Sequence, residues 1–233
     1  MDEQFAAGDR RILSLLRAQG FSPACMYDIG ASDGAWTRAV SDIFPLAHVE
    51  LFEPLAELNE PYTAPMHLLV ESDKRFHLNA VAVGLEPGKC EIHIFPNAVG
   101  STTIGLQHVP DDVRTVVVEK VAVDDLILNR GYDIPQLIKM DIQGGELDAL
   151  KGAARTLPHV DALLLETWIT RGYGSNTPLL GELVDFLRKY GFFVYDFGDE
   201  FRNVDGVLVS KDCLFVNARS SISPLYEQRS VTS

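Results

Sequence analysis

Apolar and polar residues follow two periods along this chain, one typical of amphipathic helices and one of buried strands. Apolar residues between Ile12 and Leu16, Leu15 included, fall on one helical face and predict a helix over about residues 8–20. A short apolar run, CMYDIG, predicts a strand that ends in the turn ASDG. AWTRAVSDIF then predicts a helix that stops at Pro45, and HVELFE predicts the next strand. The first seventy residues therefore predict helix, strand, helix and strand.

The remainder of the chain continues this alternation. FHLNAVAVG predicts a third strand, and KCEIHIFP, after the turn at Pro87, predicts its hairpin partner. VRTVVVEKVAV, QLIKMD and VDALLLET predict further strands, and residues 97–112 predict a loop. Helices are expected over about residues 145–156 and within TPLLGELVDFLRKYG. GFFVYDF and CLFVN predict two closing strands.

Strands that alternate with helices predict an α/β fold. We expect a mostly parallel central sheet with helices on both faces and right-handed crossovers. The two closing strands are separated by a polar loop rather than a helix, which predicts an antiparallel edge strand. The expected organisation is a helical segment over residues 1–24, one domain over 25–218 and a flexible tail over 219–233.

Composition narrows the class of protein. The chain has 233 residues, 46% of them hydrophobic, which suits one core. Its net charge of −13 argues against a nucleic acid partner, because tracking phosphates needs clustered Lys and Arg. No apolar run approaches the roughly 18 residues of a membrane span, and MDEQFAAGDRR does not resemble a secretory signal. Three scattered cysteines predict reduced thiols, no metal site and a cytoplasmic location.

The turn after the first strand is the sharpest chemical signal. Gly30 and Gly34 allow a tight backbone turn and close approach of a ligand. Their spacing is G-x-x-x-G rather than the G-x-G-x-x-G of dinucleotide-binding folds. Asp28 at the strand end suits a ligand with an ammonium group, such as the amino acid portion of S-adenosylmethionine. A plain strand-to-helix turn is the alternative.

Glu53 strengthens the nucleotide interpretation. It ends the next predicted strand, 19 positions after Gly34. That offset is close to the roughly 20 residues at which an acidic side chain can accept hydrogen bonds from ribose hydroxyls. The alternative is a solvated carboxylate at a strand end.

Several motifs together resemble the FkbM-type family of class I S-adenosylmethionine-dependent methyltransferases. They are DIGASDGAWT, LFEP, NAVAVG, GSTTI, VDDLI and above all LIKMDIQGGELDALKGA. The resemblance covers most of the chain and implies a Rossmann-like class I fold with S-adenosylmethionine as cofactor and S-adenosylhomocysteine as product. It also implies O-methylation of a small-molecule acceptor, such as a sugar, a polyketide or another secondary metabolite.

The resemblance assigns the predicted cofactor site residue by residue. It places Asp28, Gly30, Ser32, Asp33 and Gly34 around the methionine portion, Glu53 at the ribose, and Asn79 with Ala80 near the adenine. Ala31, Pro54, Asp141 and Gln143 complete the set. The segment LNAVAVG lacks an Asp, so a backbone contact to the adenine is the other option.

The chemistry is expected at the end of the strand QLIKMD. By the open-sheet rule Asp141 faces the crevice beside the cofactor, where it can orient a hydroxyl or remove its proton. His108 on the predicted loop is the second candidate base. The predicted substrate-binding residues are Ser101, Thr102, Glu146, Glu166, Trp168 and Tyr173. Glu146 has the alternative of complementing a helix dipole, and Glu166 and Trp168 that of structural residues.

The sequence is also compatible with two other functions. One is a protein that binds S-adenosylmethionine without catalysis. The other is an NAD-dependent oxidoreductase, which the glycine spacing and the lack of a Tyr-x-x-x-Lys pair weaken. No membrane partner is expected.

Overall fold

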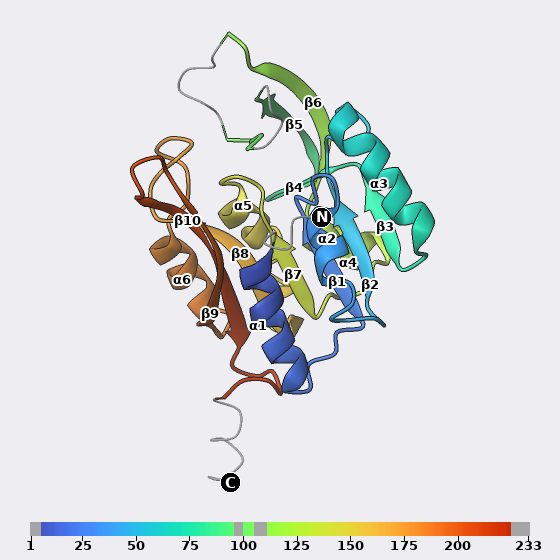
Figure 1. Ribbon diagram of the computed structural model, residues 1–233, viewed down its shortest axis with the longest axis vertical. Helices are drawn as coiled ribbons and strands as arrows, with labels where there is room; N and C mark the ends of the chain where they lie inside the picture. Colours follow the sequence, from blue (N-terminus) through green and yellow to red (C-terminus); the bar gives the residue numbers. More distant parts are fainter. Residues whose placement is uncertain (1–5, 96–99, 105–110, 225–233) are drawn as a thin grey trace.

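A seven-stranded sheet organises the chain (Figure 1). The computed structural model describes residues 6–95, 100–104 and 111–224. The strand order is β3-β2-β1-β7-β8-β10-β9, and all strands are parallel except β10, which is antiparallel to both β8 and β9. The strands are β1 (Cys25–Ile29), β2 (His48–Phe52), β3 (Phe76–Asn79), β7 (Leu137–Met140), β8 (Ala162–Trp168), β9 (Phe192–Arg202) and β10 (Leu208–Asn217). The predicted mostly parallel sheet with an antiparallel edge is confirmed.

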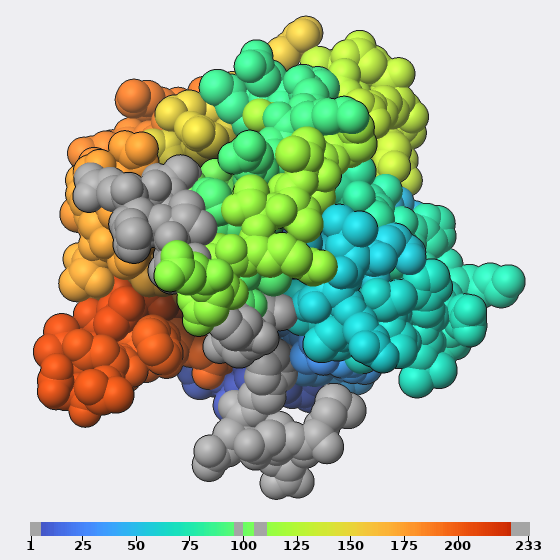
Figure 2. All heavy atoms as spheres, turned by 90° about the horizontal axis from the view of Figure 1, so that it is seen from above, coloured from blue at the N-terminus to red at the C-terminus, as the bar shows by residue number. Residues whose placement is uncertain are grey.

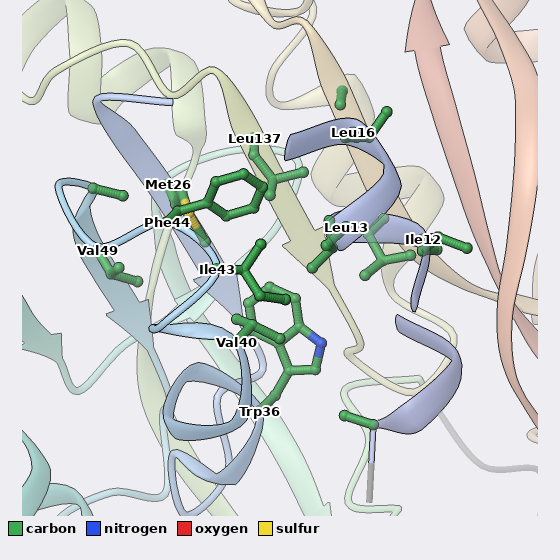
Figure 3. Packing of buried hydrophobic residues seen from close by; sticks show 14 of the residues in the cluster. Ile12, Leu13, Leu16, Met26, Trp36, Val40, Ile43, Phe44, Val49 and Leu137 are labelled. Atoms are coloured by element: carbon green, nitrogen blue, oxygen red, sulfur yellow. The ribbon is translucent and has the colours of Figure 1, made fainter. Parts of the chain in front are cut away.

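The central strands β1 and β7 are buried along their whole length because helices cover both faces of the sheet. One face carries α1 (Ala7–Ala18), α2 (Ala35–Val40) and α3 (Glu60–Ser72). The other carries α4 (Val123–Arg130), α5 (Glu146–Lys151) and α6 (Leu180–Arg188). Figure 3 shows the first core, where Ile12, Leu13 and Leu16 of α1 join Trp36 and Val40 of α2. Leu15, expected on the same face, is instead 44% exposed.

A second, three-stranded sheet lies over the carboxyl ends of the main strands (Figure 1). It consists of β4 (Ala82–Val83), β5 (Gly88–Ile94) and β6 (Arg114–Val121) in the order β4-β6-β5. The predicted single strand FHLNAVAVG with KCEIHIFP as its hairpin partner is therefore wrong. A tight turn, in which the Val81 amide donates to the Asn79 carbonyl, ends β3 and starts β4 in the other sheet. β5 pairs antiparallel with β6 instead.

The helices also differ from the prediction in four places, one of which is α2, because it ends at Val40 rather than at Phe44. α3 and α4 were not predicted, and α3 contains Pro61 in its first turn and Pro65 further in. α5 ends at Lys151, short of the predicted residue 156, and Gly152 packs so closely on Gly84 that a Cβ would overlap its carbonyl oxygen. Among the described residues no helix has the length and apolarity to cross a membrane.

Candidate functional site

The glycine turn after β1 is fitted closely against the end of β7. Gly30 has a φ of +80°, and a Cβ there would overlap the carbonyl oxygen of Asp141 and lie 2.8 Å from its carbonyl carbon. The Gly30 and Ala31 amides donate to the Phe52 carbonyl oxygen at 2.9 and 3.1 Å. The turn is therefore held between the carboxyl ends of β2 and β7, and only glycine fits at its first position.

Glu53 supports the same turn from the end of β2. One carboxylate oxygen accepts the Ser32 amide at 2.9 Å, and the other accepts the Leu55 amide at 2.9 Å. The residue is 6% exposed. Burial raises the pKa of Glu53 to about 7, although both amide hydrogen bonds oppose the shift. Each oxygen retains acceptor capacity for a further donor.

Asp28 lies beneath the turn and is fully buried. Its Oδ2 accepts the Thr37 hydroxyl at 2.6 Å, and its Oδ1 lies 3.4 Å from Nζ of Lys139. Asp28 and Lys139 are register partners on the neighbouring strands β1 and β7. The predicted contact between Asp28 and a ligand ammonium stays a prediction. The Asp28 carboxylate is, however, already paired with the Lys139 ammonium.

Lys139 is one of the site residues that the sequence interpretation missed. Its ammonium donates to the Gly30 carbonyl at 3.1 Å and lies 3.7 Å from Oδ2 of Asp141. Burial opposes the charge, but Asp28 and Asp141 outweigh it and raise the pKa of Lys139 above its ordinary value. The available signal was a lysine within the otherwise apolar strand LIKM, since a buried charge needs a partner.

Gln143 joins several of the predicted residues into one network. Its Nε2 donates to Oδ1 of Asp141 at 2.6 Å and to Oε2 of Glu166 at 3.0 Å. Its Oε1 accepts the Tyr173 hydroxyl at 2.6 Å. Gln143 has a φ of +56°, so its backbone adopts the left-handed conformation at this point. The carboxyl ends of β7 and β8 and the loop after β8 are thereby linked.

The carboxyl groups of Glu166 and Glu146 lie next to Gln143. Glu166 accepts the Ser210 hydroxyl at 2.9 Å, and burial, with Asp141 and Glu146 nearby, raises its pKa well above the ordinary value. Glu146 accepts the Ile142 and Gly144 amides, each at 3.1 Å, and its Oε2 has no hydrogen bond partner among the described residues. Burial raises the pKa of Glu146 to about 7. Burial therefore favours the protonated form of both carboxyl groups more than it would be favoured in water.

Aromatic residues close this side of the site. The Tyr173 ring packs edge-on against Trp168 at 5.2 Å between centroids. A Cβ on Gly100 would lie 2.8 Å from the Tyr173 hydroxyl. Thr102 donates its hydroxyl to the Gln143 carbonyl oxygen at 2.7 Å. Residues 100–104 and the loop after β8 thus meet at Gln143.

These elements surround an open cavity of about 760 Å³, solvent at its mouth included, at the carboxyl edge of the sheet. Figure 2 shows this end of the molecule, with the small sheet in green beside α3 in cyan. Of the predicted residues, those that line it are Gly30, Ser32, Glu53, Pro54, Ser101, Asp141 and Gln143. Its apolar wall includes Phe52, Leu55, Tyr62, Val81, Ala82, Val83 and Ile92.

The other predicted residues lie behind or beside this lining. Ala31, Asp33 and Gly34 belong to the turn, and the Asp33 carboxylate accepts the Ala35 amide at 2.9 Å. Asn79 directs its side chain elsewhere, donating to Glu50 and accepting from Tyr132, and neither it nor Ala80 lines the cavity. Thr102, Glu146, Glu166, Trp168 and Tyr173 form the layer around Gln143. His108 lies outside the described residues. The binding roles of all of them stay predictions.

Tyr62 and the residues of the small sheet were not predicted as part of the site. Tyr62 comes from α3, and burial raises the pKa of its hydroxyl. No local signal indicated it, because the helix that carries it was not predicted. Val81, Ala82 and Ile92 reach the cavity only because β4 and β5 belong to the second sheet.

Comparison with known proteins gives a family and a fold. The family described as the methyltransferase FkbM domain matches residues 28–194. A methyltransferase FkbM from Methylobacillus flagellatus has 20% identity and a TM-score of 0.53, over 83% of this chain and 43% of that one. The N-methyltransferase NodS from Bradyrhizobium japonicum has 10% identity and a TM-score of 0.51, over 93% of this chain and 98% of that one. The chain thus spans less than half of the Methylobacillus protein. No curated protein matches.

Proposed function

Because the chain belongs to the FkbM methyltransferase family, we propose that it transfers a methyl group from S-adenosylmethionine to a hydroxyl of a small metabolite. Sugars, polyketides and other secondary metabolites are the proposed acceptor class. One observation carries the proposal. The glycine turn, Glu53 and Asp141 meet at a single cavity over the carboxyl ends of parallel strands, which is where open α/β sheets bind ligands.

The lining residues suit an adenosyl cofactor. Gly30 presents backbone without a side chain, and the Glu53 carboxylate keeps acceptor capacity for two ribose hydroxyls. The apolar wall with Phe52, Leu55 and Val81 suits a flat base. The bound cofactor would supply a methyl group on a positively charged sulfur.

Asp28 and Asp141 take different roles in this proposal. Asp28 is fully buried, and its charge is matched by Lys139, so we assign it to holding the turn rather than the ligand. Asp141 has a side chain that is 36% exposed and lines the cavity. It is therefore the carboxylate available to the acceptor.

A hydroxyl acceptor must lose its proton as the new bond to carbon forms. Asp141 and Glu53 are the two carboxylates among the described residues that line the cavity; Glu53 is assigned to the ribose, and the Gln143 amide fixes the orientation of Asp141 at 2.6 Å. Glu166 lies on the other side of that amide, and its raised pKa favours holding a proton. Tyr173 and Trp168 help to exclude water from this side. The chain's own residues would thus orient the acceptor and take its proton.

The Asp141→Asn variant tests this role. We expect methyl transfer to fall by about 10²- to 10⁴-fold, because an amide cannot accept the proton. The affinity for S-adenosylhomocysteine should change much less than turnover does. Transfer is measured with a labelled methyl group and a panel of hydroxylated acceptors, and affinity by calorimetry.

The matched control is Asp148→Asn on α5, an exposed carboxylate that pairs with Lys151. It should leave turnover unchanged. Equal turnover in wild type and Asp141→Asn would refute the assigned role. Cofactor binding without transfer to any acceptor in the panel would favour a protein that binds S-adenosylmethionine without catalysis.

A further inference from the structure

Two histidines and a glutamate meet on neighbouring strands, away from the cavity. Glu50 on β2 is the register partner of His77 on β3, and His48 lies two positions earlier on β2, on the same face as Glu50. Glu50 precedes Glu53 by three residues, about 10 Å along an extended chain. We propose that His48, Glu50 and His77 bind a zinc ion.

The geometry suits a single small ion. One potential ligand atom from each residue lies within 4.8 Å of the other two. Oε1 of Glu50 is 2.7 Å from Nε2 of His48 and 3.5 Å from Nδ1 of His77. Zinc bonds of about 2.0–2.1 Å at tetrahedral angles place ligand atoms about 3.3 Å apart. The two distances lie on either side of that value, so small side-chain rotations would admit the ion.

The carboxylate is held in place by residues behind it. Oε2 of Glu50 accepts the Asn79 amide at 2.7 Å, and Oδ1 of Asn79 accepts the Tyr132 hydroxyl at 2.8 Å. This leaves Oε1 directed at both histidines. Hydrogen bonds of this kind orient ligating carboxylates in metal sites and raise their affinity. Glu50 is 8% exposed, so the arrangement is more rigid than a surface pair.

The chemical nature of the three potential ligands indicates which metal they would bind. Two imidazoles and one carboxylate suit zinc and related transition metals, whereas Mg²⁺ and Ca²⁺ prefer oxygen ligands. His48 and His77 have side chains 33% and 54% exposed, which leaves access from solvent and an open fourth position for water. The bound ion would fasten the edge strand β3 to β2.

The described residues contain one other group with comparable spacing, formed by Asp9, Asp199 and Asp212. Its oxygens are partly occupied, since Asp9 accepts the Trp36 indole and Asp199 accepts the Gly8 and Asp9 amides. It offers no nitrogen ligand. The histidine group is therefore the stronger zinc candidate.

Calorimetry with zinc chloride tests the site on the full chain, freed of metal by a chelator and carrying no histidine tag. We expect one equivalent to bind with micromolar or tighter affinity and to raise the melting temperature by a few degrees. His77→Ala should weaken binding by about a hundredfold or more, because it removes one of three ligands. Cobalt should give the absorption bands of a four-coordinate ion, lost in the variant.

The matched control is His67→Ala. His67 pairs with Glu57 at 3.0 Å in an exposed position without a second histidine, so zinc affinity should stay unchanged. His77 is exposed, and circular dichroism of His77→Ala checks that the fold is kept. Absence of stoichiometric zinc binding, or equal affinity in folded His77→Ala and wild type, would overturn the proposal. Neither result bears on methyl transfer.

Discussion

Replacing Lys139 with methionine is expected to lower the free energy of unfolding by about 3–5 kcal/mol, the usual cost of removing one partner of a buried ion pair. The ammonium lies 3.4 Å from Asp28 and 3.7 Å from Asp141, and its residue is 8% exposed. Methionine is unbranched and only one heavy atom shorter than lysine, but it leaves Asp28 as an unpaired buried charge. Urea denaturation followed by circular dichroism measures the loss.

Two further variants identify the cause. Adding Asp28→Asn to Lys139→Met removes the unpaired charge and should recover part of the lost stability. Lys151→Met removes an exposed lysine that pairs with Asp148 and should change stability by less than about 1 kcal/mol. A loss in Lys139→Met no larger than in Lys151→Met would show that the buried pair does not stabilise the turn.

Gly30→Ala is expected to cost about 3 kcal/mol or more and to abolish binding of S-adenosylhomocysteine. A methyl group would overlap the Asp141 carbonyl, so the turn or the end of β7 must move. The positive φ of +80° adds the penalty of a left-handed conformation. Urea denaturation and calorimetry measure the two effects.

Gly131→Ala separates steric overlap from backbone strain. Gly131 has a φ of +76°, close to that of Gly30, but a Cβ there meets no atom of the described part of the chain within 4 Å. It should cost about 1–2 kcal/mol and leave ligand binding intact. Similar losses in the two variants would mean that contact with Asp141 is unimportant.

Local sequence patterns were sufficient for the part of the site formed by strand ends. The run CMYDIG, its glycine turn and the following helix form one continuous unit, and Glu53 ends the next strand. Asp141 and Gln143 follow an apolar strand, so the open-sheet rule placed them at the same edge. Gln143, Asp141, Glu166 and Tyr173 were each predicted as site residues. The hydrogen bonds that join these four side chains were not predicted.

Pairings between distant segments could not be predicted. The partner of β5 is β6 rather than the nearer β3, and that choice depends on a turn near Val81 and on packing over Leu55 and Tyr62. Prolines within α3 concealed a helix whose buried face, with Met66 and Leu69, completes a core. The pairing of Lys139 with Asp28 could not be predicted, because it depends on the register between β7 and β1.

In the proposed function, the cavity over Gly30 and Glu53 receives the adenosyl cofactor. A crystal structure of the full chain grown with S-adenosylhomocysteine tests it most directly. We expect the ligand in this cavity, with its ribose hydroxyls donating to the Glu53 carboxylate and open space beside Asp141 for an acceptor. Ligand density at another position, or a ribose that makes no contact with Glu53, would contradict it.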